Sequence, residues 1–197
     1  MSLRASLLVT IVLLAFTSLG CGGDPPDKEI QQAQSAIDTA RAAGADKYAA
    51  EEYAAAVTAL ANAKAAVEQR DYRLALNGAL DSRERAENAA AQAAEGQAAA
   101  RTAAERALAA ATAAVSAGYA KVKAAGTAHL PARTLADART AVTDAEQRVQ
   151  EARTAIRNGD YDTAMTAASA ATQAIKAATD RIEAAAAPPG RRRLSRH

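Results

Sequence analysis

Large apolar residues recur every seven positions through the second half of the chain, and this spacing constrains the fold more than any other feature. The series runs through Leu135, Val142, Val149 and Ile156, with Ala138, Ala145 and Ala152 between them, and continues through Tyr161, Ala168, Ile175 and Ile182. Alternating steps of three and four residues place one apolar stripe along an α-helix. The first half carries similar stripes at Ile30, Ala33, Ile37 and Ala40 and at Tyr53, Leu60 and Val67. The spacing therefore predicts helices that pack along these stripes.

Few residues interrupt the helices. Pro131 is the only proline between Lys28 and Ala187, and proline suits the first turn of a helix. Asp71 and Asp160 can cap helix N-termini through their carboxylates. These signals predict helices near 28–43, 49–69, 72–124, 131–157 and 160–186. Gly96 is the expected bend or break in the third helix, because glycine weakens a helix interior.

Alanine accounts for 61 of the 197 residues. It is the best helix former, but its side chain buries little apolar area. Such a chain must gain stability from long helices whose axes approach closely. We therefore predict an all-α fold, an elongated alanine-rich helical bundle or coiled coil with two three-helix units that share a long central helix.

Two parts of the chain are similar to each other. Residues 43–67 align with 125–149, and residues 71–75 align with 160–164 after a further shift of seven positions. An insertion of one heptad lengthens a helix by two turns and leaves its apolar stripe facing the same way. The sequence thus predicts one helical repeat at 28–96 and a second at 97–187. A flexible tether at 21–27 precedes them, and a basic disordered tail at 188–197 follows.

The N-terminus has the three parts of an export signal. Arg4 precedes an uncharged apolar run at residues 5–16, and small residues follow. The run is too short to span a bilayer, which takes roughly 20 residues. We predict a cleaved signal peptide at 1–20, with Cys21, the only cysteine, directly after the cleavage point. The alternative is an ordinary secretory signal followed by a free thiol.

The stretch TSLGCGG at 17–23 resembles the lipobox of bacterial lipoproteins, with Gly20 as the small residue before Cys21 and Ser18 where leucine is usual. With the Asp-Tyr-x-x-Ala helix starts at 71–75 and 160–164, the chain resembles an uncharacterised family of bacterial envelope lipoproteins that carry an alanine-rich helical domain of unknown function. The resemblance implies a diacylglycerol lipid on Cys21, no other cofactor, and a place in the cell envelope. Gly22 implies the periplasmic face of the outer membrane if the cell is diderm.

The sequence contains no catalytic or metal-binding motif. Its two histidines, His129 and His197, have no cysteine or second histidine at ligand spacing. We predict no catalytic residue, no metal site and no enzymatic activity. Removal of residues 1–20 leaves 23 basic and 22 acidic residues, and this balance gives no field that would attract nucleic acid.

Five tyrosines are the only aromatic residues after the signal: Tyr48, Tyr53, Tyr72, Tyr119 and Tyr161. We expect them to plug the bundle ends where helices enter and leave, because they stand at predicted helix starts and tyrosine suits half-buried sites that keep its hydroxyl in water. The alternative is an aromatic platform for a ligand.

The C-terminal tail concentrates positive charge in Arg191, Arg192, Arg193 and Arg196. These residues are candidates for contact with an anionic surface, and the alternative is a solvated tail without a function. We expect a lipid-anchored, non-enzymatic envelope protein that acts as a helical spacer, adaptor or scaffold for an unidentified envelope protein or cell-wall partner. Alanine-rich heptads could also pair between chains in a homo-oligomer. The second hypothesis is an envelope binding module that holds a small ligand or cell-wall fragment between helices.

Overall fold

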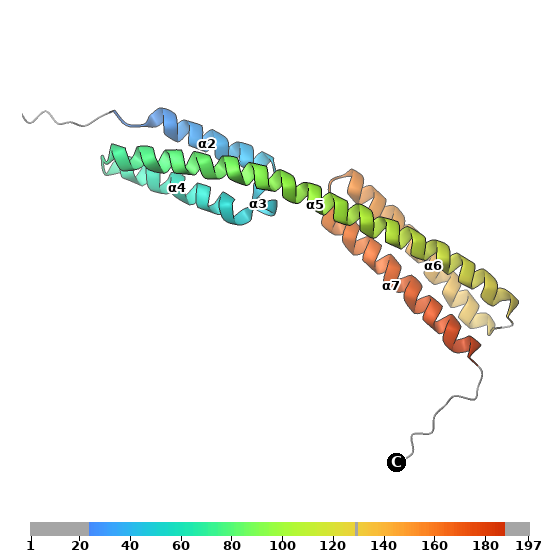
Figure 1. Ribbon diagram of the computed structural model, residues 1–197. Coiled ribbons are helices and arrows are strands. Elements are labelled where there is room, and N and C mark those ends of the chain that lie inside the picture. Colours follow the sequence, from blue (N-terminus) through green and yellow to red (C-terminus); the bar gives the residue numbers. More distant parts are fainter. Residues whose placement is uncertain (1–23, 129, 188–197) are drawn as a thin grey trace, which may run out of the picture. The chain divides into compact units, whose positions relative to one another are not determined.

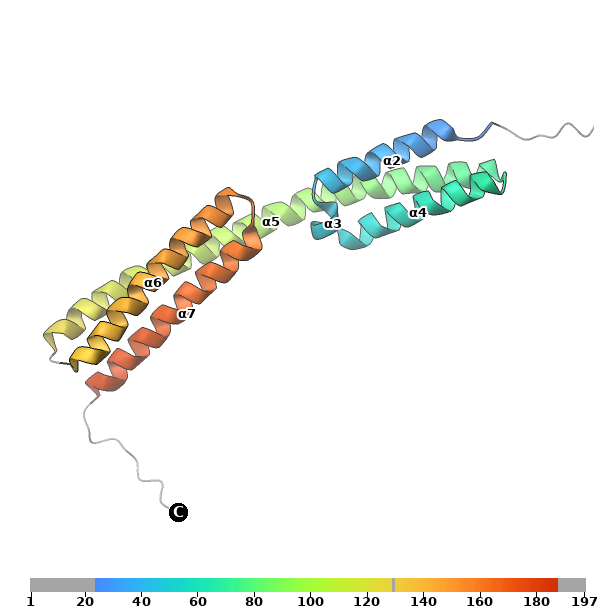
Figure 2. The same ribbon diagram turned by 180° about the vertical axis from the view of Figure 1, so that it is seen from behind.

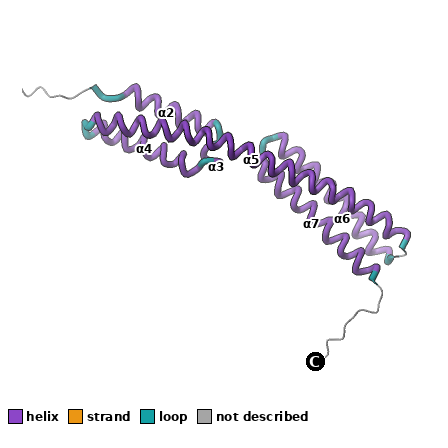
Figure 3. The backbone as a smooth tube through the Cα atoms, viewed as in Figure 1, coloured by secondary structure: helices purple, strands orange, loops and turns teal. Residues whose placement is uncertain are grey.

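The computed structural model describes residues 24–128 and 130–187, which are helical almost throughout (Figure 3). The helices are α2 (Asp27–Ala42), α3 (Ala45–Tyr48), α4 (Ala50–Glu68), α5 (Tyr72–Thr127), α6 (Ala132–Arg157) and α7 (Tyr161–Ala186). Over these residues there is no strand. The predicted all-α helical bundle is confirmed, and the predicted helix ends lie within three residues of those observed.

The chain packs as two compact units, one ending at Gly96 and the other beginning at Gln97. Unit 1 contains α2, α3, α4 and the first part of α5 (Figure 1). Unit 2 contains the remainder of α5 with α6 and α7 (Figure 2). Each unit therefore places three long helical segments around one core, and α5 contributes to both.

The core of unit 1 consists almost entirely of alanine. Ten of its twelve clustered buried residues are alanine, and the other two are Ile37 on α2 and Leu60 on α4. Half-buried Ile30, Tyr48 and Tyr53 pack against this cluster. Because alanine side chains fill little volume, the three helices can be held together only at close range.

Unit 2 has a larger apolar core. Its main cluster holds fourteen buried residues, eight of them alanine and six of them valine or isoleucine. Val142 and Val149 on α6 and Ile175 and Ile182 on α7 are all buried, which confirms the predicted stripes on these helices. Leu135 belongs to the same stripe but is only half-buried near the start of α6.

Of the bend or break predicted at Gly96, the break is wrong, because α5 runs through Gly96 from Tyr72 to Thr127. A Cβ atom at Gly96 would lie 3.1 Å from Tyr48 Cβ and 3.3 Å from the Tyr48 carbonyl oxygen. Gly78 and Gly118 would likewise bring a Cβ atom to 3.1 Å from Ala63 and Ile175. A Cβ atom at these glycines would be tighter against a neighbouring side chain than packing normally allows, so the glycines permit close packing rather than end the helix.

Ordered packing begins earlier than the sequence predicts. Pro26 is buried and precedes the first residue of α2, Asp27, whose N–H donates to the Pro25 carbonyl oxygen at 2.9 Å. The predicted tether of residues 21–27 thus includes residues that pack in unit 1. The short helix α3 was also missed; it follows Gly44, which adopts φ 81° in the turn after α2.

Candidate functional site

Asp71 and Asp160, the two predicted helix caps, lie in turns with the same hydrogen bonds. Asp71 Oδ1 accepts from the Leu74 N–H at 3.0 Å, and Asp160 Oδ1 accepts from the Thr163 N–H at 3.2 Å. The backbone N–H of each aspartate also donates, at 2.9 Å, to a carbonyl oxygen five residues earlier, of Ala66 or of Ala155. These bonds close the preceding helix and satisfy a free N–H group of the next.

The residue before each aspartate has a left-handed backbone, and here the two turns differ. Gly159 has φ 76°, whereas Arg70 has φ 60° and is the only non-glycine residue with positive φ among those described. A side chain disfavours this conformation by about 1–2 kcal/mol. The turn of unit 1 therefore holds an arginine in a position that suits glycine.

Arg70→Gly is expected to raise the free energy of unfolding by about 0.5–1 kcal/mol, because relief of the left-handed strain exceeds the extra freedom that glycine gives the unfolded chain. Gly159→Arg is the matched control and should lower it by a similar amount, since a Cβ atom there meets nothing within 4 Å and only the backbone is strained. Urea unfolding followed by circular dichroism measures both. A loss of stability in Arg70→Gly would contradict the assignment of strain.

The other predicted site residues lie outside the described part of the chain. They are Cys21, the proposed lipid acceptor; Arg191, Arg192, Arg193 and Arg196 of the tail; and the histidines His129 and His197. Their roles therefore stay predictions.

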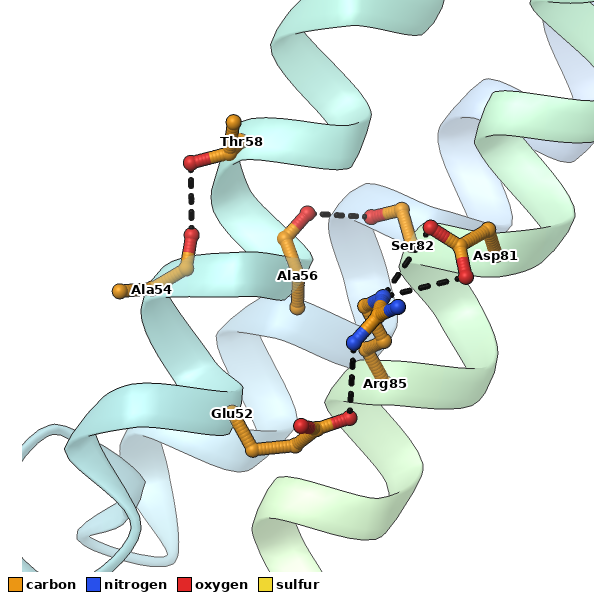
Figure 4. Close-up of polar contacts among 7 residues, drawn as sticks. All are labelled: Glu52, Ala54, Ala56, Thr58, Asp81, Ser82 and Arg85. Atoms are coloured by element: carbon orange, nitrogen blue, oxygen red, sulfur yellow. Dashed lines mark hydrogen bonds and ion pairs between the residues drawn. The ribbon is translucent and has the colours of Figure 1, made fainter.

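One buried hydrogen bond ties α4 to α5 inside unit 1. Ser82 is fully buried, and its Oγ donates to the carbonyl oxygen of Ala56 at 2.8 Å (Figure 4). Ser82 is the only buried polar residue in the described ranges. Burial of a hydroxyl costs free energy unless the hydroxyl is hydrogen-bonded. This contact therefore fixes the relative position of the two helices at one point in a core that is otherwise almost entirely alanine.

Next to Ser82, an ion-pair network joins the same helices. The Arg85 Nε lies 3.1 Å from both carboxylate oxygens of Asp81, and its Nη1 lies 3.4 Å from Glu52 Oε1 on α4 (Figure 4). The hydrogen bond to Asp81, followed by the charges of Asp81 and Glu52, raises the pKa of the guanidinium. The network is largely exposed, so it adds to helix alignment more than to stability.

Ser82→Ala is expected to lower the free energy of unfolding of unit 1 by about 1 kcal/mol, the usual net value of one hydrogen bond. Ser116→Ala on the same helix is the control; that hydroxyl is exposed and donates to Thr112 within its own helix, so its loss should change little. Amide hydrogen exchange measures each loss in the unit that holds the substitution, over residues 50–96 for Ser82→Ala and over residues 97–127 for Ser116→Ala. Equal effects of the two variants would show that the interhelical bond carries no stability.

The tyrosines do not form one platform within either unit. Tyr48 and Tyr53 pack against the core of unit 1, and the Tyr53 hydroxyl accepts from Arg41 Nε at 2.7 Å. Tyr161 is buried at the start of α7. Tyr119 lies well inside α5, which corrects the prediction that all five mark helix starts. It donates to Glu146 Oε2 at 2.7 Å, and this bond raises the pKa of its phenol.

In residues 24–128 and 130–187, no three His, Cys, Asp or Glu side chains gather as metal ligands. A groove of about 510 Å³ between α5 and α6 is lined by Tyr119, Val122 and Arg139, among others, and one of about 230 Å³ between α6 and α7 by Thr134, Asp137 and Arg181. None of the described helices combines the length and hydropathy needed to cross a bilayer.

The structural roles of three residues are not predicted by the sequence, for different reasons. Ser82 lies among polar neighbours, and nothing in its spacing marks it as buried. Gly118 reads as a helix-weakening residue until its neighbours are known. Arg70 had a signal, because the alignment of Asp71 with Asp160 places it opposite Gly159 in a turn.

Comparison with known proteins gives a match over part of the chain. No curated protein and no solved structure matches it. The matched segment comprises α2, α3, α4 and α5 as far as residue 105, and so includes the alanine core, Ser82 and the turn at Arg70. Residues 28–105 match a family described as a domain of unknown function, DUF4398.

Proposed function

We propose that the protein is a lipid-anchored, non-enzymatic component of a bacterial cell envelope that acts as a helical spacer or adaptor. The observation that carries the proposal is the position of Cys21, directly after a short apolar run and small residues. A diacylglycerol on this thiol would bury many CH₂ groups at about 0.8 kcal/mol each and hold the chain on a membrane. The face of the outer membrane toward the periplasm is the proposed location in a diderm cell.

The described residues support a spacer or adaptor over a binding module. Each unit uses its apolar stripes to pack its own helices, and the side chains on the outer faces are mostly charged or small. Such surfaces suit contact with another protein or with cell wall through several weak polar interactions. We propose further that the two units are copies of one helical repeat, because the turns at Asp71 and Asp160 share the pattern Asp-Tyr-x-x-Ala and their hydrogen bonds.

The second candidate is a binding module for a small ligand or a cell-wall fragment. The groove of about 510 Å³ beside Tyr119 and Arg139 is the observation that favours it, since an aromatic ring next to a cation can hold a sugar or a carboxylate. Soluble peptidoglycan fragments should then shift the NMR signals of residues 119–126 and 139–143.

Photo-crosslinking in intact cells tests the adaptor role. A photoreactive residue placed at Arg148 on α6 or at Ala177 on α7, both exposed, should capture one and the same envelope component. In a Cys21→Ser background the capture should be lost, because the chain no longer stays at the membrane. Capture of nothing at either position, or identical capture without the cysteine, would contradict a tethered adaptor.

A further inference from the structure

Exposed leucines gather at the beginning of α5. Leu74, Leu76 and Leu80 are 56%, 36% and 45% exposed, and they account for three of the five large apolar side chains left exposed in the described residues. Leu76 and Leu80 lie four residues apart, and Arg73 lies three residues before Leu76, so the three share one side of the helix. We call Arg73, Leu76 and Leu80 the leucine face.

The leucine face lies at the end of unit 1 from which the chain leads back toward Cys21. Figures 1 and 2 both show the residues before α2 at the same end of unit 1 as the turn that joins α4 to α5. Arg83 Nη1 donates to Gln32 Oε1 at 3.3 Å, which aligns α5 with α2. Asp27 lies five residues before Gln32 in α2, and Leu76 lies seven residues before Arg83 in α5, so the two lie within one helical turn of the same level.

The distance between this end and the proposed anchor is short. Two residues stand between Cys21 and Asp24, so three Cα-to-Cα steps link them and span about 10 Å when the chain is fully extended. Because Pro26 is already buried in unit 1, the following residues cannot lengthen the connection. An acylated Cys21 would thus keep the leucine face within reach of the lipid headgroups, whose layer is roughly 5–7 Å deep on each side of a bilayer.

The chemistry of this end suits a bilayer surface. Leucine side chains enter the boundary between headgroups and acyl chains, while arginine keeps its guanidinium at the phosphate level. The charged residues at this end are five acidic and three basic, namely Asp24, Asp27, Lys28, Glu29, Glu68, Arg70, Asp71 and Arg73, so attraction to anionic lipid is not the driving force. Arg70 lies at the same end of unit 1 and adds a second guanidinium. Its backbone is left-handed, a conformation that glycine would adopt without strain.

We propose that unit 1 docks on the phospholipid surface through the leucine face, so that the anchored end of the protein lies against the membrane rather than at the end of a flexible tether. This docking rests on the proposed lipid anchor at Cys21. The partner is a zwitterionic bilayer, because apolar side chains dominate the contact. Docking should therefore change little with salt concentration.

The absence of tryptophan from the chain permits a direct test. Leu76→Trp supplies a single fluorescent probe in the leucine face. Glu51→Trp supplies a matched probe at an exposed position at the opposite end of α4, away from the turn to α5. Both variants are purified as the acylated mature chain and placed in phosphatidylethanolamine–phosphatidylcholine vesicles with lipid brominated near the headgroup end of its acyl chains. Tryptophan emission should fall at least about twofold in the Leu76→Trp variant and stay unchanged in the Glu51→Trp variant.

Each other outcome has a definite meaning. Equal emission from the two variants in an acylated sample overturns the docking and leaves the anchor intact. Emission from the Leu76→Trp variant that is blue-shifted but not quenched shows that a second copy of the chain covers the face, and also overturns the docking. An intact mass without acyl chains overturns the anchor and the docking together.

Discussion

Leu60→Ala is expected to lower the free energy of unfolding of unit 1 by about 3 kcal/mol, the usual range for removal of a buried leucine side chain being about 2–5 kcal/mol. Leu60 is 4% exposed and is one of two buried residues larger than alanine in the main core cluster of unit 1. A loss of this size is a large part of the total stability of a small domain. Amide hydrogen exchange over residues 27–96 should show it as faster exchange throughout α2 and α4.

Val57→Ala on the same helix is the matched control. Val57 lies three residues before Leu60 but is 40% exposed, so its truncation should cost less than about 0.5 kcal/mol. Hydrogen exchange in unit 2 serves as an internal reference that should stay unchanged, because Leu60 lies in the core cluster of unit 1. Equal losses of stability in Leu60→Ala and Val57→Ala would show that the alanine core does not depend on its large buried residues.

Gly118→Val is expected to lower the free energy of unfolding of unit 2 by about 2 kcal/mol through overpacking. A Cβ atom at this position would lie 3.1 Å from Ile175 Cδ1 and 3.3 Å from Val142 Cγ2, so it would enter the centre of the three-helix core. The gain in helix propensity over glycine is only a few tenths of a kcal/mol and does not offset the clash. Thermal unfolding followed by circular dichroism, with hydrogen exchange over 97–187, measures the effect.

Gly126→Ala tests whether the effect comes from packing or from the backbone. Gly126 lies in the same helix, and a Cβ atom there would meet nothing within 4 Å. This variant should be unchanged or slightly more stable. Equal destabilisation by Gly118→Val and Gly126→Ala would mean that α5 requires glycine for a reason other than contact with α6 and α7.

The fold could be predicted from the sequence because its main signals are periodic. The heptad spacing of Val142 and Val149 placed both in the core of unit 2, and the turn signals around Asp71 and Asp160 placed the helix ends to within a few residues. Helix periodicity depends only on local geometry, so one chain is enough to detect it.

What could not be predicted depends on contacts between distant residues. The partner of Ser82 lies 26 positions away on another helix, and the space beside Gly96 is set by Tyr48 on α3. The periodic pattern of a sequence cannot distinguish a glycine that weakens a helix from a glycine that allows a side chain of a neighbouring helix to approach. The exposure of Leu76 and Leu80 also required the structure, because their spacing alone would suit a buried stripe.

The anchor at Cys21 is the central claim, and the intact mass of the protein extracted from host membranes tests it most directly. We expect a chain that has lost residues 1–20 and gained the mass of acyl chains, and a Cys21→Ser variant that carries no acyl mass and leaves the membrane fraction. A mature chain that begins at Cys21 or nearby with an unmodified thiol would contradict the anchor and make the protein a secreted helical bundle.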